Sequence, residues 1–308
     1  MKNIDIVVIG QTGQLSCAYH DLFKHKNNLD NVCFLSRKDL DLTKTSEIAK
    51  TLDSLFCNCN VKVVINTAAD TAVEDIETHK DRAFQTNAVG PGILASWCAE
   101  KNTHFIHFST DYVYCGDGKI PWKETSETAP LNVYGASKLA GENKIIETAC
   151  KHLIFRTSWI YSSVGRNFFT TMLQLGESKE ELKIICDQIG APTYAVHLAE
   201  ISWAAYQKIC NKNPFPSGIY NLCSNGFTSW YGFASKIFEL AYPLDKKLIV
   251  KKITPVKSIE HSSKVCRPLN SRLALEKFQK TFNLDIPHWE AGLKECMEIV
   301  YASHPTQD

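Results

Sequence analysis

The sequence has almost no net charge. Its 34 Lys and Arg residues balance 33 Asp and Glu residues, which leaves a formal charge of +1 over 308 residues. A chain this close to neutrality has no overall field to attract nucleic acid or an anionic membrane. No apolar run approaches the ~20 residues of a membrane span, and the run at 6–9 is too short for a signal peptide. We therefore predict a cytoplasmic protein without a nucleic-acid or membrane partner.

Cysteine is present, but without the density or spacing that would give it a structural role. Twelve cysteines in 308 residues are too sparse for a disulfide scaffold. Cys57 and Cys59 form the closest pair, and no second Cys or His pair accompanies them as in zinc sites. We therefore predict free thiols in a reducing compartment and no bound metal.

What the sequence does contain is a large apolar fraction, 44%, which excludes disorder and can fill the core of a large domain. Short apolar, β-branched runs predict strands at 6–9, 32–35, 63–66, 105–109 and 153–156. Runs that are apolar on both faces are typical of a parallel sheet covered by helices. We predict an α/β fold with a Rossmann-like doubly wound sheet, whose NAD(P)-binding domain spans residues 1–160.

The strand and helix alternation weakens beyond residue 160, where prolines at 192, 214, 216, 243, 255 and 268 mark loops. Periodicity there predicts helices at 167–177, 198–210 and 230–241 and strands at 183–185 and 218–222. No repeat or low-complexity linker separates the two halves of the sequence. We predict that residues 161–308 form a smaller, mainly substrate-binding α/β region, from which some segments return to the Rossmann domain.

The first predicted strand leads directly into a glycine-rich turn, Gly10-Gln11-Thr12-Gly13, followed by Gln14 and Leu15 in a helical pattern. Glycines allow backbone N–H groups and a helix N-terminus to approach a pyrophosphate, because no Cβ blocks the way. The spacing alone would also suit an ordinary tight turn. Its position in the first strand–helix unit favours a dinucleotide site.

A basic turn, Ser36-Arg37-Lys38, follows the second predicted strand, where an NAD-binding protein would carry an acid. A hydroxyl beside two cations suits the 2′-phosphate of NADPH. Asp39 and Asp41 reduce the local positive charge, and a solvated basic turn is the alternative explanation. We predict NADPH as the first choice of cofactor and NADH as the second.

Tyr134 and Lys138 are four residues apart in a segment, 133–149, with a helical pattern, so both project from one face. This spacing arises by chance in many helices. Its chemistry is nevertheless specific, because a nearby cation stabilises a phenolate and lowers the tyrosine pKa from about 10. Thr110 ends the fourth predicted strand, at the sheet edge where α/β proteins bind ligands. We expect these three side chains to meet in one crevice.

These residues resemble the extended short-chain dehydrogenase/reductase family, and within it the rhamnose-forming branch. The matching segments cover nearly the whole chain in order, at residues 10–15, 66–73, 109–113, 130–142, 156–161, 187–193, 218–220, 228–231 and 267–273. The resemblance implies reduction of dTDP-4-dehydro-L-rhamnose to dTDP-L-rhamnose with NADPH or NADH. It implies a nucleotide-sugar substrate and allows a homodimer.

The resemblance also implies residue roles. The catalytic residues would be Thr110, Tyr134 and Lys138. The sugar would be contacted by Thr110, Asp111, Tyr112 and Trp159. The cofactor would be held by Gly10, Thr12, Gly13, Gln14, Leu15, Ser36, Arg37, Asp41, Leu42, Ala68, Ala69, Thr71, Asn87, Tyr134 and Lys138.

Two alternatives share this pattern. One is a cofactor-binding regulatory subunit like that of methionine adenosyltransferase, which is not an enzyme. The other is a nucleotide-sugar epimerase or dehydratase, although a dehydratase would carry a second acid where Tyr112 follows Asp111. The sequence departs from the family pattern at Ser16, which stands where a third glycine is usual.

Overall fold

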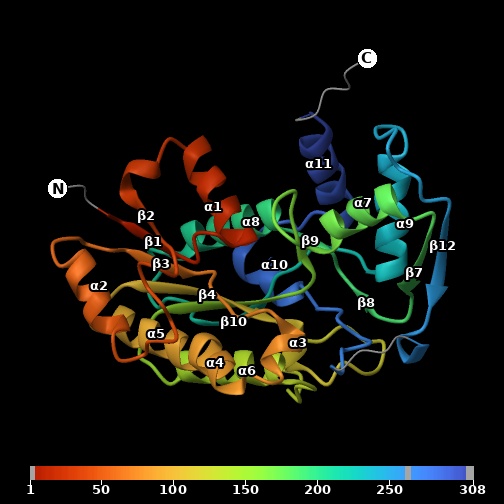
Figure 1. Ribbon diagram of the computed structural model, residues 1–308. Helices are drawn as coiled ribbons and strands as arrows, with labels where there is room; N and C mark the ends of the chain where they lie inside the picture. The colour runs from red at the N-terminus through yellow and green to blue at the C-terminus, as the bar shows by residue number, and fades with distance from the viewer. Residues whose placement is uncertain (1–3, 261–264, 303–308) are drawn as a thin grey trace.

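The computed structural model describes residues 4–260 and 265–302, so Met1, Lys2 and Asn3 of the N-terminal stretch lie outside the described residues (Figure 1). Its centre is a six-stranded parallel sheet in the order β10-β5-β4-β3-β1-β2. The strands are β1 (Ile6–Ile9), β2 (Val32–Leu35), β3 (Val63–Asn66), β4 (His104–Thr110), β5 (His152–Thr157) and β10 (Gly218–Asn221). The prediction of a doubly wound α/β fold is confirmed.

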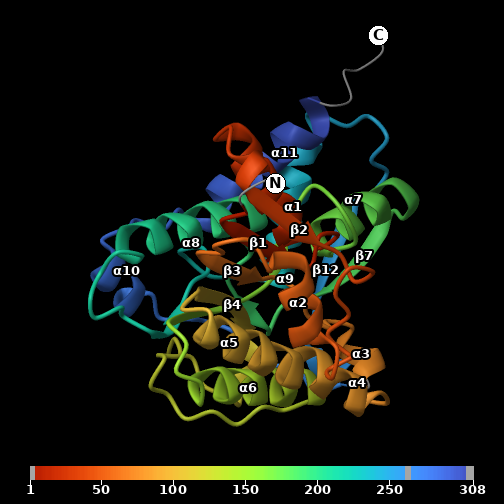
Figure 2. The ribbon, with the colours of Figure 1, turned by 90° about the vertical axis from the view of Figure 1, so that its left-hand side faces the viewer.

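Helices cover both faces of the sheet, which explains why its strands are apolar on both sides (Figures 1 and 2). Val8 packs toward one face and Val7 toward the other, in two separate hydrophobic clusters. The first cluster includes buried residues of α1 (Gln14–His25), α8 (Ala195–Ile209) and α10 (Glu276–Phe282). The second includes residues of α2 (Ile48–Phe56), α5 (Gly90–Glu100) and α6 (Val133–Ile146).

The strand order creates a crevice at the carboxyl edge of the sheet. β1 lies between β2 and β3, and Ile9, Leu35 and Asn66 end these three strands side by side. The chain leaves β1 toward one side and enters β3 on the other, so the following loops diverge. Short elements follow β3 and β4, namely α3 (Val73–Ile76), α4 (Lys80–Phe84), the π-helix η2 (Gln85–Val89) and the 3₁₀ helix η3 (Asp111–Val113).

Residues beyond 160 contribute both to this sheet and to a separate core. β10 pairs with β5, and α8 packs against α1. A third hydrophobic cluster joins α7 (Phe168–Ser178), β7 (Glu181–Ile185), α9 (Trp230–Ala241) and α11 (Trp289–Ala302), beside β12 (Lys252–Val256). Shorter elements are η1 (Leu29–Asn31), β6 (Ile160–Tyr161), β8 (Ile189–Gly190), β9 (Thr193–Tyr194), β11 (Thr228–Ser229) and η4 (Ser258–Glu260).

The strands predicted at 6–9, 32–35 and 63–66 have the bounds observed for β1, β2 and β3. The helix predicted at 133–149 ends earlier, at Ile146, and the helix predicted at 198–210 starts earlier, at Ala195. In the described part of the chain, no helix combines the length and the apolar character needed to span a membrane.

Candidate active site

A crevice of about 430 Å³ opens where the loops after β1, β2 and β3 diverge. Most of the cofactor residues predicted from the sequence line it, namely Gly10, Thr12, Gly13, Ser36, Arg37, Asp41, Leu42, Ala68 and Ala69. These residues come from three loops far apart in the chain, so the sheet topology brings them together. We call this space the cofactor crevice.

The backbone around Gly10 fits a pyrophosphate. Gly10 has φ +107°, and a Cβ there would lie 2.8 Å from Thr67 Oγ1 and 2.9 Å from the Ala68 nitrogen. Only glycine therefore suits this position. Gly13 precedes α1, whose first turn contains no acidic residue, so the positive end of the helix dipole can face an anion.

Ser36 and Arg37 of the predicted phosphate-binding turn are hydrogen-bonded to neighbouring acidic residues. The Ser36 backbone N–H and hydroxyl both donate to Asp39 Oδ2, at 2.8 and 2.6 Å, and these bonds lower the Asp39 pKa. Arg37 Nε donates to Asp41 Oδ2 at 3.2 Å, while the Arg37 side chain is 72% exposed. An exposed ion pair of this kind is weak, so Arg37 can exchange Asp41 for a more highly charged phosphate.

Thr110 and Tyr134 meet at the carboxyl end of β4. Asn132 caps α6 by accepting a hydrogen bond from the Gly135 N–H at 2.9 Å, which sets Tyr134 in the first turn. The Thr110 side chain is hydrogen-bonded to Tyr134, and this bond lowers the Tyr134 pKa, whereas burial raises it by more. Tyr134 is therefore a neutral phenol near neutral pH and can donate a proton.

Asp111 is a buried carboxyl group directly beside this pair. It is 2% exposed, and burial raises its pKa to about 7 although bonds from Ser271 and Thr110 lower it. Among the described residues, Asp111 Oδ2 has no hydrogen-bond partner. The charge of Asp111 also raises the Tyr134 pKa. Asp111 thus changes charge near neutral pH, next to the proton donor.

Lys138 lies one helical turn after Tyr134 and is 1% exposed. Its Nζ donates to the Phe108 carbonyl at 2.6 Å and lies 3.1 Å from His107 Nε2. Burial lowers the Lys138 pKa to about 8, while the charge of Glu142 raises it. That Lys138 lowers the Tyr134 pKa remains a prediction, because the groups that shift this pKa in the structure are Thr110 and Asp111.

Three residues predicted to bind the cofactor, Gln14, Leu15 and Asn87, are not among those that line the crevice. Asn87 accepts from the Asp70 N–H at 2.8 Å and donates to Ser137 Oγ at 3.0 Å, so it ties the loop after β3 to α6. Gln14 accepts from Ser162 Oγ and Asn167 Nδ2, and Leu15 is buried in the core. The side chains of Gln14 and Asn87 are thus hydrogen-bonded within the protein, and the Leu15 side chain packs in the core.

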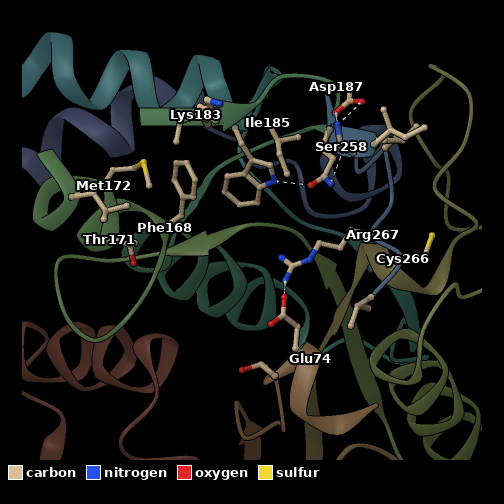
Figure 3. Close-up of a pocket in the computed structure, with 18 of the residues that line it drawn as sticks. Glu74, Phe168, Thr171, Met172, Lys183, Ile185, Asp187, Ser258, Cys266 and Arg267 are labelled. Carbon is tan, nitrogen blue, oxygen red and sulfur yellow. Dashed lines mark hydrogen bonds and ion pairs between the residues drawn. The ribbon is translucent and has the colours of Figure 1, made fainter. Parts of the chain in front are cut away.

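Figure 3 shows a second, larger cavity, of about 970 Å³. It is lined by Thr71 and Glu74 after β3, by residues of α7 and β7, by Trp230, and by C-terminal residues, namely Ser258, Ile259, Val265, Cys266, Arg267 and Leu269. Arg267 Nη2 donates to Glu74 Oε1 at 3.2 Å across it. Its volume is that of sites for drug-sized ligands. We call it the C-terminal cavity; Thr71, predicted to bind the cofactor, lines this space instead of the crevice.

Trp159, predicted to contact the sugar, is covered by another tryptophan. Its ring stacks on Trp230 with centroids 3.6 Å apart and planes at 9°. Trp159 has φ +50°, a strained conformation for a bulky residue, and a Cβ on Gly190 would lie 2.7 Å from its ring. Trp230 lines the cavity and donates from Nε1 to Gln188 Oε1 at 3.1 Å. Trp159 therefore supports the wall that Trp230 forms.

Comparison with known proteins agrees with this geometry. The family model described as the RmlD substrate binding domain matches residues 4–302. Over 303 residues the sequence is 38% identical to the dTDP-4-dehydrorhamnose reductase of Escherichia coli K12, covering 97% of this chain and 99% of the relative. The chain belongs to the dTDP-4-dehydrorhamnose reductase family.

Solved structures of the same family have the same fold. The reductase from Clostridium acetobutylicum superposes with a TM-score of 0.86 at 33% identity, over 96% of this chain and 99% of that chain. The reductase from Bacillus anthracis, solved in complex with NADP, gives 0.84 at 31% identity, over 96% and 98%. The predicted family and enzyme class, an oxidoreductase, are confirmed.

Two residues at the dTDP-4-dehydrorhamnose reductase site, Arg82 and His107, were not predicted from the sequence. Arg82 lines the crevice and donates from Nε to Asp70 Oδ2 at 2.7 Å, but nothing in its short helical segment indicated this. His107 was also missed, although a lone imidazole within an apolar strand is a visible signal. Within residues 4–260 and 265–302, no group of three His, Cys, Asp or Glu side chains could hold a metal ion.

Proposed function

We propose that this chain reduces the C4 ketone of dTDP-4-dehydro-L-rhamnose to give dTDP-L-rhamnose, with NADPH as the reductant. The observation that carries the proposal is that contacts connect Tyr134 and its helix α6 to residues of two ligand-sized spaces. On the crevice side, Asn87 connects Asp70 to α6. On the cavity side, the Tyr112 hydroxyl is hydrogen-bonded to Arg267. A cofactor in the crevice and a sugar in the cavity would meet at Tyr134.

The proton chemistry follows from the neutral state of Tyr134. NADPH, when bound, supplies the hydride. The Tyr134 phenol donates its proton to the ketone oxygen as charge develops there, and the Thr110 hydroxyl donates a second hydrogen bond to the same oxygen. Lys138, buried one turn away on α6, is the cation that we expect to stabilise the resulting phenolate. Tyr134 is thus the general acid of the proposed reaction.

The choice of NADPH rests on the turn after β2. Ser36 and Arg37 line the crevice, and no acid occupies the position after the second strand that would hold an unphosphorylated ribose. The weak pair between Arg37 and Asp41 leaves the guanidinium free to bind a 2′-phosphate. The NADP complex of the Bacillus anthracis relative supports this choice.

The C-terminal cavity suits the nucleotide sugar. Phe168 and Trp230 form an aromatic wall, with ring centroids 4.5 Å apart, against which a base or a sugar ring can stack. Arg267 and Lys183 also line the cavity, and their positive charges can bind the diphosphate of the nucleotide sugar (Figure 3). We assign the nucleotide sugar to this cavity and the cofactor to the crevice.

The regulatory-subunit alternative predicts cofactor binding without turnover. The test is to mix purified protein with NADPH and enzymatically prepared dTDP-4-dehydro-L-rhamnose and to follow cofactor absorbance and sugar product together. We expect one dTDP-L-rhamnose for each NADPH oxidised. Binding of NADPH without oxidation would reject the proposal in favour of the regulatory subunit. Elimination of water from a hexose substrate, with no net NADPH use, would favour the dehydratase.

A further inference from the structure

His107 is a fully buried histidine that contacts Lys138 but has no role in the reaction described above. It lies in β4, directly beside Asn66 of β3 in the sheet register. Its Nδ1 is 3.1 Å from Asn66 Nδ2, and its Nε2 is 3.1 Å from Lys138 Nζ. Because paired residues on adjacent strands lie close together, the sheet register holds the contact between Asn66 and His107 in place.

The backbone determines which ring nitrogen of His107 carries the proton. The Ala68 N–H donates to Asn66 Oδ1 at 3.1 Å, which fixes the orientation of the Asn66 amide. The Asn66 Nδ2 group must therefore donate to His107 Nδ1, because an NH₂ group cannot accept. Burial is the main cause that lowers the His107 pKa well below its usual range, and a charge on Lys138 would lower it further, so the ring is neutral with either form of Lys138. Its single proton then lies on Nε2, facing Lys138.

This tautomer constrains the charge of Lys138. A charged ammonium group has three donors and no acceptor, so it cannot take a hydrogen bond from His107 Nε2–H. An uncharged amine can accept that bond and still donate to the Phe108 carbonyl, 2.6 Å away. The two contacts of the Lys138 nitrogen, with His107 Nε2 and with the Phe108 carbonyl, can therefore both be hydrogen bonds only when the amine is uncharged.

The other charged groups near Lys138 do not reverse this preference. Glu142, one turn further along α6, accepts two hydrogen bonds from Arg156 of β5, at 2.9 and 2.6 Å, so a full positive charge already balances it. Tyr134, one turn earlier, is neutral, and the titratable Asp111 is hydrogen-bonded on the far side of Thr110. His107 is thus the group that faces the Lys138 nitrogen.

We propose that His107 is a positioning residue that favours the uncharged amine of Lys138 in the cofactor-free protein, and that Lys138 takes up a proton when NADPH binds. The anionic cofactor favours a cation at this position, and its ribose hydroxyls provide acceptors that the free protein lacks. The hydrogen bonds of His107 end at the Ala68 backbone, so His107 sets the charge of Lys138 without relaying protons. The inference deepens the proposed function, since it concerns the same site.

The first test identifies the tautomer of His107 in the cofactor-free protein. Long-range proton–nitrogen NMR spectra of protein labelled at histidine, assigned with the His107→Gln variant, distinguish the two tautomers from the imidazolium. We expect a neutral ring protonated at Nε2. A proton on Nδ1, or a charged ring at neutral pH, would overturn the inference. This result requires neither turnover nor a ligand.

The second test counts protons taken up on NADPH binding, by calorimetry at about pH 8.5 in two buffers of different ionisation enthalpy. With Lys138 titrating at a pKa of about 8, we expect uptake of most of one proton by the unmodified protein. His107→Gln can offer its carbonyl oxygen to the ammonium, so uptake should fall close to zero. Equal uptake in the two proteins would contradict the inference.

Two control variants test whether the change in proton uptake is specific to His107. His152→Gln changes another buried histidine, which bonds the Cys150 carbonyl at the opposite end of β5, and it should leave proton uptake unchanged. Asp111→Asn removes a buried carboxyl group whose pKa is about 7, and it should also leave proton uptake unchanged. No sugar substrate is present, so absence of turnover would reject the proposed function while these measurements still decide the role of His107.

Discussion

The cofactor crevice and the C-terminal cavity are adjacent, but they are built in different ways. The crevice consists of loops that each follow a strand of one sheet, within residues 9–86. The cavity draws on residues from Thr71 to Leu269, carried by α7, β7, α9 and irregular segments. The sheet fixes the first space through backbone geometry, whereas the second depends on how side chains of distant segments pack. Changes in each space should therefore affect one ligand and spare the other.

The largest effect is expected where the two spaces meet. Tyr134→Phe removes the proton donor but leaves the ring and its packing, so kcat should fall roughly 100- to 10,000-fold. NADPH affinity, measured by fluorescence titration, should stay within about twofold, because the hydroxyl acts mainly in the transition state. A comparable loss of NADPH affinity would show that Tyr134 holds the cofactor instead.

Asp111→Asn tests the buried carboxyl at this junction. The native pKa of about 7 exceeds the ordinary 3.8, so the folded protein retains a proton that the unfolded chain releases as pH rises. Stability contributed by Asp111 is therefore present below about pH 4 and lost as pH rises to 7. At pH 8 the asparagine variant should be more stable to urea by about 2–4 kcal/mol, and at pH 4 nearly equal. A difference that does not change with pH would contradict this account.

Trp230→Ala tests the cavity alone. Loss of the aromatic wall should raise the KM for the nucleotide sugar roughly 10- to 100-fold, since burying an aromatic face is worth about 1.5–3 kcal/mol. NADPH affinity should be unchanged, which also shows that the variant is folded. Trp230→Phe, which keeps a flat ring on Trp159, should retain most of the affinity. A matching loss of NADPH affinity would mean that the two spaces are not independent.

Arg37→Ala tests the crevice alone and should have the smallest effect. NADPH affinity should weaken about tenfold, because one exposed charged contact to phosphate is lost, and NADH affinity should hardly change. Lys44→Ala is the control, since Lys44 is an exposed residue of the same region that pairs with Glu47 outside the crevice. A loss that is equal for NADPH and NADH would exclude contact with the 2′-phosphate.

The different construction of the crevice and the cavity explains which of their residues could be predicted from the sequence. Gly10 and Arg37 follow short apolar strands directly, so their positions at the sheet edge follow from local patterns and parallel topology. The Tyr134 and Thr110 contact was also predictable, because a helix face and a strand end both point to that edge. Membership of the reductase family, inferred from ordered motifs, is confirmed by the matches over nearly the full chain.

The C-terminal cavity could not be predicted in this way. Trp159 and Trp230 are 71 positions apart, and nothing local shows that one ring covers the other. Leu15 and Asn87 are expected from the resemblance to hold the cofactor, but local patterns do not show that Leu15 is buried in the core or that Asn87 is hydrogen-bonded to Ser137. β12 contains Pro255 and is only partly buried, so it lacks the pattern of a central strand. Long-range packing, invisible in local periodicity, decides such positions.

The central claim is that hydride passes from a cofactor in the crevice to a sugar in the cavity, with Tyr134 supplying the proton. The most direct measurement uses NADPH carrying deuterium at both C4 positions of the nicotinamide, with dTDP-4-dehydro-L-rhamnose as substrate. Mass and NMR analysis should show one deuterium at C4 of dTDP-L-rhamnose for each NADPH oxidised, and almost none with Tyr134→Phe. Cofactor oxidation that leaves no deuterium at C4, or NADPH binding without product, would contradict the account.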